Sequence, residues 1–319
     1  MPEFCRHGRF VQNCRICSPP AERAVGGQPS RSPSPARGSA GASGSSSASR
    51  SRGGLVVRRA ARAADDGYAH GLVPGLKASG DARRLVNELA FATARLGELA
   101  ADPPGLYAEV ASGADHEEAT WLAFLVTYLG PTVEAPFAAI HAVRTPWAGD
   151  ALPDLDGAAR GPRSSHDPAR GQQTLAAYRA WAARHGGQAA AFTGDASWSS
   201  QRRFDRLFER LALPGFGRAG RYELLVALGA LGLYDLRATS LRVEDDATTL
   251  AAKRVLGIGD RMNLERRAAA LAEGLELEIA ALDLALFNWG QPQDERATMG
   301  ARAGPDPLLR DRLAAALGL

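Results

Sequence analysis

Long hydrophobic runs are missing from this sequence of 319 residues. No apolar run approaches the roughly 18 residues that a bilayer-spanning helix needs, and the first residues lack the apolar segment of a secretory signal. We therefore expect a cytoplasmic protein with no membrane association. Lysine is also scarce, since only Lys77 and Lys253 occur, so arginine supplies nearly all the positive charge.

The charge is unevenly distributed along a chain of ordinary composition. Hydrophobic residues make up 45% and charged residues 23%, which is typical of a soluble globular protein. Residues 1–62 contain 11 arginines against Glu3 and Glu22, whereas the remainder carries a net negative charge. A basic arm on an acidic body suggests a polyanionic partner, although an arginine-rich tail can also serve only as a soluble tail.

Composition divides the chain into three segments. Residues 1–17 contain all three cysteines. In residues 18–54, 34 of the 37 residues are Ser, Gly, Ala, Pro or Arg, so the segment lacks the apolar surface needed for a core and is predicted to be a disordered linker. Residues 55–319 have a globular composition and are predicted to form one helical domain.

The first segment has the ligand spacing of a zinc site. Cys5 and His7 are followed by Cys14 and Cys17, which gives three thiolates and one imidazole. This Cys₃His set suits tetrahedral Zn²⁺, and a closed site with four protein ligands is structural rather than catalytic. Three incidental reduced thiols are the alternative interpretation.

Apolar residues of the third segment recur at helical spacing, so the predicted fold class is all-α. Around Asp65–Gly67, two short apolar runs allow either a small hairpin or an extended arm. The predicted helices cover 85–99, 121–129, 174–185, 204–211, 222–233 and 275–289, and a last one begins at Asp306-Pro307.

A glycine-rich turn joins two of these predicted helices. It reads Leu213-Pro214-Gly215-Phe216-Gly217 and is followed by Arg218. Glycines in such a hairpin let backbone N–H groups point outward at the start of the next helix, where they can bind a nucleic-acid phosphate without reading sequence. A plain helical turn is the alternative, because Pro-Gly turns join helices in many proteins.

The turn and its surroundings resemble the helix-hairpin-helix DNA glycosylases over roughly residues 81–292. In that family an essential aspartate follows the helix after the hairpin, and here Asp235 stands 18 residues after Gly217. The resemblance implies a polar pair, Thr127 and Tyr128, at the base pocket. Lyase-type members carry a lysine where this chain has Ala219, so the resemblance implies a water nucleophile. The iron–sulfur cysteines of some members are missing.

A second resemblance extends over the whole chain. The cysteine motif, the serine-rich linker and four further segments are similar to bacterial proteins of the alpha-glutamyl/putrescinyl thymine pyrophosphorylase family, clade 3. The segments are 63–68, 121–125, 211–216 and 282–286. This resemblance implies a DNA-glycosylase-like fold and a connection to hypermodified thymine in phage DNA, either in making it or in host defence against it.

Six polar residues have competing interpretations. Tyr234 and His166 are candidates for a base pocket, although most aromatics at helical spacing are core residues and most loop histidines are simply exposed. Asp235 is the candidate catalytic acid, with helix capping as its alternative role. Asp245-Asp246 is predicted to be a loop acid pair or a helix cap. Asp283, on an apolar helix, is either a paired core group or a second pocket acid.

Three functions fit these observations. The first is a monofunctional DNA glycosylase that flips a modified pyrimidine out of the helix and cleaves its N-glycosidic bond. The second is a transferase that displaces pyrophosphate from an activated 5-hydroxymethyluracil in DNA with an amine or amino acid. The third is a DNA-binding module without activity. The sequence favours excision slightly over transfer.

Overall fold

The computed structural model describes residues 62–149, 151–301 and 304–319. The predicted zinc ligands and the predicted linker lie outside these residues. The described residues contain α-helices, one 3₁₀ helix and turns, but no β-strand, which confirms the all-α prediction. The elements, in chain order, are α1 (Ser79–Ala101), α2 (Leu106–Ser112), α3 (His116–Leu129), α4 (Ala138–Val143), α5 (Gly171–Arg184), α6 (Gln188–Thr193), α7 (Ser200–Arg210), α8 (Arg218–Ala230), α9 (Ala247–Leu256), α10 (Arg261–Gly274), α11 (Ile279–Gly290), the 3₁₀ helix η2 (Gln293–Glu295) and α12 (Pro307–Ala316).

Local sequence signals fix many helix ends. The side chains of Asp115, Ser199 and Asp306 accept backbone N–H groups in the first turns of α3, α7 and α12. Pro307 occupies the first position of α12, where its missing N–H costs nothing. The cap at Asp306 places the start of α12 where the sequence predicts it, whereas the caps at Asp115 and Ser199 start α3 and α7 about one turn before the predicted apolar stretches.

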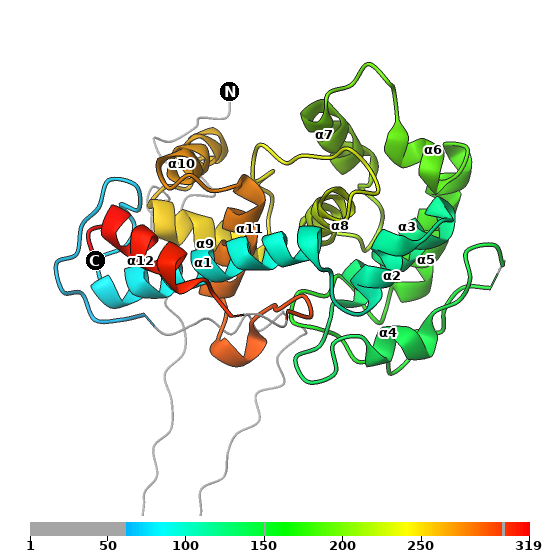
Figure 1. Cartoon of the computed structure of the whole chain (residues 1–319), viewed down its shortest axis with the longest axis horizontal. Coiled ribbons are helices and arrows are strands. Elements are labelled where there is room, and N and C mark those ends of the chain that lie inside the picture. Colours follow the sequence, from blue (N-terminus) through cyan, green and yellow to red (C-terminus); the bar gives the residue numbers. More distant parts are fainter. Residues whose placement is uncertain (1–61, 150, 302–303) are drawn as a thin grey trace, which may run out of the picture. The chain divides into compact units, whose positions relative to one another are not determined.

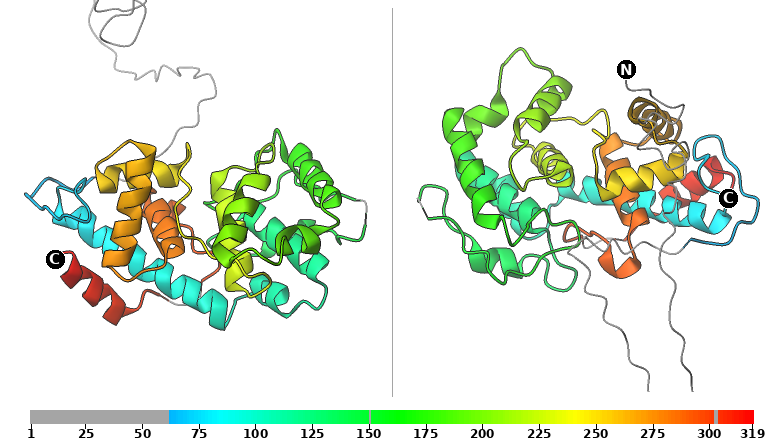
Figure 2. Two further views of the ribbon diagram at one scale, coloured as in Figure 1. Left: turned by 90° about the horizontal axis from the view of Figure 1, so that it is seen from above. Right: turned by 180° about the vertical axis from the view of Figure 1, so that it is seen from behind.

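The helices pack in two groups. One group consists of α1 with α9, α10, α11 and α12, so it combines the beginning and the end of the described chain; the other consists of α2 to α8 (Figure 1). The long helix α1 packs on α11 and α12 and also contacts α8, so it belongs to the core of the first group and touches the second. Figure 2 shows the same two groups from two further directions.

Some predicted boundaries are wrong, and five helices were not predicted from periodicity. Helix α8 ends at Ala230 rather than Leu233, and Leu275 follows α10 instead of opening α11. The short helices α2, α4 and α6 contain too few turns for a periodic signal, whereas α9 and α10 are too rich in alanine and charge to show a clear apolar stripe. Residues 62–70 form no strand, which fits the extended arm rather than the hairpin.

Asp65 and Asp66 stabilise that arm. Asp65 accepts the N–H of Gly67, and Asp66 accepts the N–H groups of Tyr68 and Ser79. Among the described helices, none is both long enough and apolar enough to cross a membrane.

Candidate functional site

The predicted hairpin lies between α7 and α8 in the conformation that its glycines allow. Gly215 has φ +74°, and a Cβ there would lie 2.2 Å from Oγ1 of Thr174. The Thr174 hydroxyl donates a hydrogen bond of 2.9 Å to the carbonyl of Pro214, which pins the turn to α5. Gly217 is exposed and begins α8 without a side-chain cap. The backbone N–H groups that open α8 are therefore not occupied by a capping side chain, as the phosphate-binding prediction requires.

The other hairpin residues divide into surface and anchor positions. Pro214 is exposed and Leu213 is half-buried, so both border the surface of the turn. Phe216 is buried and contacts the rings of Phe124 and Tyr128. Phe216 thus fixes the hairpin to α3 and has no face left for DNA.

Arg218 differs from its prediction as a DNA-backbone contact. Its side chain is only 1% exposed and points into the interior, where it meets Asp246 and Asp283. A guanidinium held in this way cannot reach a phosphate outside, because its donors are already engaged. Only the backbone N–H of Arg218 stays at the exposed start of α8.

An exposed arginine lies beside the hairpin instead. Arg170 directly precedes α5, and its Cβ is 3.6 Å from where a Cβ on Gly215 would be. Its side chain is 63% exposed, and its ion pair with Asp167 is long at 3.9 Å. Arg170 is therefore available to a polyanion that contacts the hairpin.

The predicted base-pocket residues are not gathered into one pocket. Tyr128 and Tyr234 stand at opposite ends of a run of contacting rings that passes through Phe124, Tyr178, Trp181 and Phe192. All of these rings are buried. The core interpretation of the aromatic residues therefore holds for this set, since the rings pack against one another and leave no room for a base.

The polar atoms of these residues are also engaged or enclosed. Tyr234 shares a hydrogen bond of 2.7 Å with the hydroxyl of Thr120, and burial raises the pKa of Tyr234 to about 12. Thr127 is fully buried. His166 is 8% exposed, packs edge-on against Tyr128 and has a pKa lowered mainly by burial, so its imidazole is neutral at pH 7. His166 is thus a core histidine that holds the 161–170 loop against α3.

Asp235 lies far from the hairpin. It follows the C-terminal end of α8, whose 13 residues span about 20 Å. Its carboxylate is 74% exposed and pairs with Arg203 at 3.0 Å. It lines a cavity of about 500 Å³ together with Ser200, Arg237 and Glu278. The catalytic role of Asp235 stays a prediction, and Asp235 lies at the opposite end of α8 from the hairpin.

Asp246 is the carboxylate that the structure brings to the hairpin end of α8. It is the N-cap of α9, where Oδ1 accepts the N–H of Thr249 at 2.8 Å. Its Oδ2 lies 3.3 Å from Nη1 of Arg218, the first residue of α8. The side chain is 15% exposed, so Asp246 is partly accessible to solvent. The predicted capping role of Asp246 is confirmed, and its contact with the start of α8 is new.

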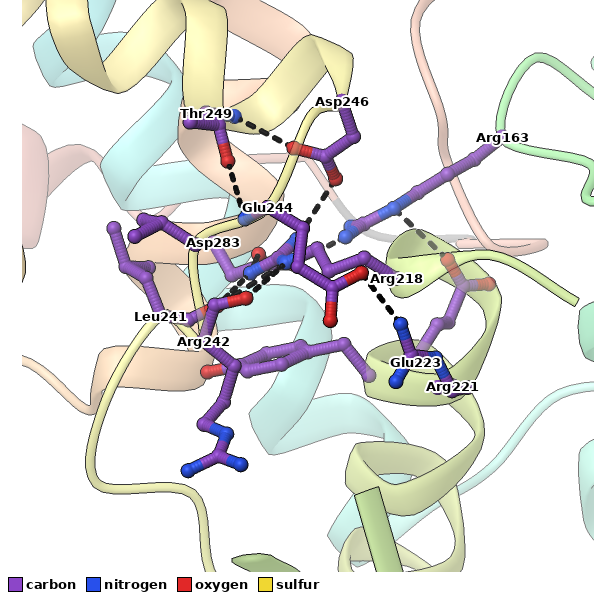
Figure 3. A network of polar contacts seen from close by, with 12 residues as sticks. Arg163, Arg218, Arg221, Glu223, Leu241, Arg242, Glu244, Asp246, Thr249 and Asp283 are labelled. Carbon is purple, nitrogen blue, oxygen red and sulfur yellow. Dashed lines mark hydrogen bonds and ion pairs between the residues drawn. The ribbon is translucent and has the colours of Figure 1, made fainter. Parts of the chain in front are cut away.

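A buried ionic network lies directly behind Asp246 (Figure 3). Asp283 on α11 pairs with Arg218 at 2.5 Å and also with Arg163. Arg163 forms a second ion pair, at 3.2 Å, with Glu223 of α8. Burial alone would raise the pKa of Asp283, but the two arginines lower it, so Asp283 is ionised. Of the two interpretations of Asp283, the paired core group is the correct one.

Glu223 is the least stabilised acid of this network. Burial raises its pKa to about 7, and Arg163 only partly opposes that shift. Sequence reasoning did not place Arg163 and Glu223 in a buried network. One signal was available for Glu223, which stands within the apolar stretch of α8 as Asp283 does within α11.

One comparison with known proteins finds a family model that matches part of the chain. Residues 163–297 match the family described as alpha-glutamyl/putrescinyl thymine pyrophosphorylase clade 3, which confirms the family named from the sequence. The match begins at Arg163 and includes the hairpin, Asp246 and Asp283. No curated protein and no solved structure matches the chain.

Proposed function

We propose that this protein, part of which matches the thymine pyrophosphorylase clade, modifies a thymine-derived base in DNA. In the proposed reaction an amine or amino acid displaces pyrophosphate from a pyrophosphorylated 5-hydroxymethyluracil. The family match supports transfer over excision, because the family description names a pyrophosphorylase that acts on thymine. The observation that carries the site assignment is the contact of Asp246 with Arg218 at the start of the hairpin helix.

In this proposal the hairpin binds the DNA backbone. The exposed start of α8 after Gly217 offers backbone N–H groups to a phosphate, and Arg170 adds a positive charge beside it. A base inside a duplex cannot be reached by a side chain, so the target nucleotide is flipped out of the stack. Asp246 then lies at the end of α8 that contacts the strand, whereas Asp235 lies at the other end.

Asp246 supplies a proton acceptor for the transfer step. The amine nitrogen attacks the methylene carbon on C5 of the base, and the carbon–oxygen bond to pyrophosphate breaks with its electron pair going to the leaving oxygen. The nitrogen becomes positively charged as the new carbon–nitrogen bond forms, and it then loses a proton. The partly exposed carboxylate of Asp246 accepts that proton in this proposal.

Excision is the second candidate, and one observation favours it. The glycosylase resemblance places Ala219 where lyase-type members carry a lysine, which implies a monofunctional enzyme, and Asp246 supplies a carboxylate at the hairpin end of α8. A carboxylate there stabilises positive charge on the sugar as the N-glycosidic bond breaks. The two reactions share the hairpin, the flipped base and Asp246, and they differ in which bond breaks.

The assignment of Asp246 is tested by a substitution that removes the charge of its side chain but preserves the N-cap of α9. In Asp246→Asn the amide oxygen still caps α9, because Asn is as good an N-cap as Asp. The matched control is Asp260→Asn, since Asp260 caps α10 through the same bond, to Asn263 at 2.9 Å. We expect turnover of pyrophosphorylated DNA to fall by about 10² to 10⁴ in Asp246→Asn and to stay near wild type in Asp260→Asn.

Asp235→Asn is assayed beside these two variants. If Asp235→Asn is inactive and Asp246→Asn is active, the catalytic acid is Asp235, as the sequence predicts, and not Asp246. Full DNA binding without turnover of any modified DNA by the wild-type protein would favour a binding module.

A further inference from the structure

The segment that leads to Asp246 is held in an unusual backbone conformation. Between α8 and α9 the chain passes through residues 241–246, and Arg242 has φ +53°. A side chain disfavours this left-handed region, so the surrounding structure must hold it there. Arg242 stands four residues before Asp246, which places the strained residue in the segment that carries the proposed proton acceptor.

Glu265 of α10 holds the N–H groups of this segment. Its Oε2 accepts the N–H of Leu241 at 2.8 Å, and its Oε1 accepts the N–H of Val243 at 2.7 Å. One carboxylate therefore binds the backbone on both sides of the strained Arg242. Because both carboxylate oxygens accept a backbone N–H, neither an amide nor a shorter side chain can reproduce the two hydrogen bonds.

Arg218 holds the carbonyl groups of the same segment. Its Nε donates to the carbonyl of Leu241 at 3.1 Å and to that of Arg242 at 3.3 Å, and its Nη2 also donates to Leu241. The same guanidinium reaches the side chain of Asp246 through Nη1. Arg218 is in turn fixed from behind by Asp283 at 2.5 Å.

We infer that Arg218 and Glu265 are positioning residues that hold residues 241–246 so that the Asp246 carboxylate is in place before DNA binds. The inference rests on the proposed role of Asp246. Reaction rates depend steeply on the placement of a catalytic group, and a shift of about 1 Å can cost 10²-fold. Arg218 also begins the hairpin helix, so the grip on the strand and the position of Asp246 belong to one rigid unit.

The experiment compares two variants with two controls that have the same chemistry elsewhere in the fold. Arg218→Lys keeps the charge but lacks the forked donors, and Glu265→Gln keeps the shape but loses one acceptor. Arg95→Lys is the control for the first, because Arg95 is also buried and bonds a carbonyl, that of Met299, and a carboxylate, that of Glu98. Glu117→Gln is the control for the second, because Glu117 also accepts two backbone N–H groups, those of Gln188 and Ala189.

The expected result separates positioning from simple loss of stability. We expect kcat to fall by about 10- to 100-fold in Arg218→Lys and Glu265→Gln, with KM for DNA unchanged. Both controls should lower the melting temperature by similar amounts while keeping kcat. A kcat near wild type in both variants, or an equal loss of kcat in the controls, would overturn the inference.

Asp246→Asn in the same assay distinguishes a failure of the positioning inference from a failure of the proposed function. If Asp246→Asn is inactive while Arg218→Lys and Glu265→Gln turn over normally, only the positioning role is wrong. If Asp246→Asn is fully active, the assignment of Asp246 is wrong and the positioning role falls with it. Should Arg218→Lys fail to fold, Glu265→Gln decides the question alone, since it acts on the same segment from α10.

Discussion

The guanidinium of Arg218 lies 2.5 Å from the carboxylate of Asp283, and both side chains are almost completely buried. The contact joins the first residue of the hairpin helix to α11, so it connects the two groups of helices. Arg163 reaches the same carboxylate from the loop before α5. A single acid in an otherwise apolar helix thus fixes the helix that presents the hairpin.

The first prediction concerns the stability that depends on Asp283. Asp283→Asn leaves Arg163 and Arg218 without their shared counter-charge in the interior. Breaking a buried pair in this way costs about 3–5 kcal/mol of unfolding free energy, measured by urea denaturation. Asp311→Asn, which breaks an exposed pair with Arg310, should cost less than about 1 kcal/mol. Equal losses in the two variants would contradict the role of the network.

The second prediction concerns the pH dependence of stability. The pKa of Glu223 is raised to about 7 in the folded protein from an ordinary value of 4.5, so folding favours its protonated form. Its contribution to the free energy of unfolding is therefore fully present below pH 4.5 and is lost as pH rises through about 7. Relative to wild type, Glu223→Gln should therefore gain about 3 kcal/mol between pH 4.5 and 8. The exposed Glu276→Gln should show no such trend. Parallel curves for wild type and Glu223→Gln would refute the shift.

The third prediction concerns the salt dependence of DNA binding. Arg170→Ala should weaken binding to duplex DNA and reduce the slope of log K against log salt by about 1, because one phosphate contact is lost. Arg184→Ala is the matched control, since Arg184 is exposed at the other end of the same helix, α5. An unchanged slope in Arg170→Ala, or an equal change in Arg184→Ala, would remove Arg170 from the interface.

The fourth prediction concerns the zinc ligands that lie outside the described residues. Purified protein that includes residues 1–17 and has intact thiols should contain stoichiometric zinc, as measured by elemental analysis, and Cys14→Ser should bind it more weakly because one of four ligands is lost. Turnover should not require an added metal, because a closed Cys₃His site has no open coordination position. Protein that has intact thiols and contains no zinc would contradict this prediction.

The sequence predicts the helices of this fold better than it predicts the site. Periodic apolar residues and caps such as Asp306 mark the longer helices, because those signals are local. The hairpin at Gly215 was also predictable, since a Pro-Gly turn has a local conformational cause. Short helices such as α6 carry too little pattern to be recognised.

The site was harder to predict because its chemistry depends on which residues meet in space. Spacing along the chain favoured Asp235, yet the fold places Asp246 at the hairpin end of α8. Arg218 follows an exposed turn and was expected on the surface, but two carboxylates draw its side chain inward. Tyr128 and Tyr234 were candidates for one pocket, but they lie at opposite ends of a packed run of rings.

The most direct test of the proposed reaction is mass spectrometry of its products. DNA that carries pyrophosphorylated 5-hydroxymethyluracil is incubated with the protein and a small amine, and both the nucleosides and the released small molecules are analysed. The proposed function predicts free pyrophosphate and a nucleoside that carries the amine on the C5 methylene. Free modified base together with abasic sites would contradict transfer and establish excision.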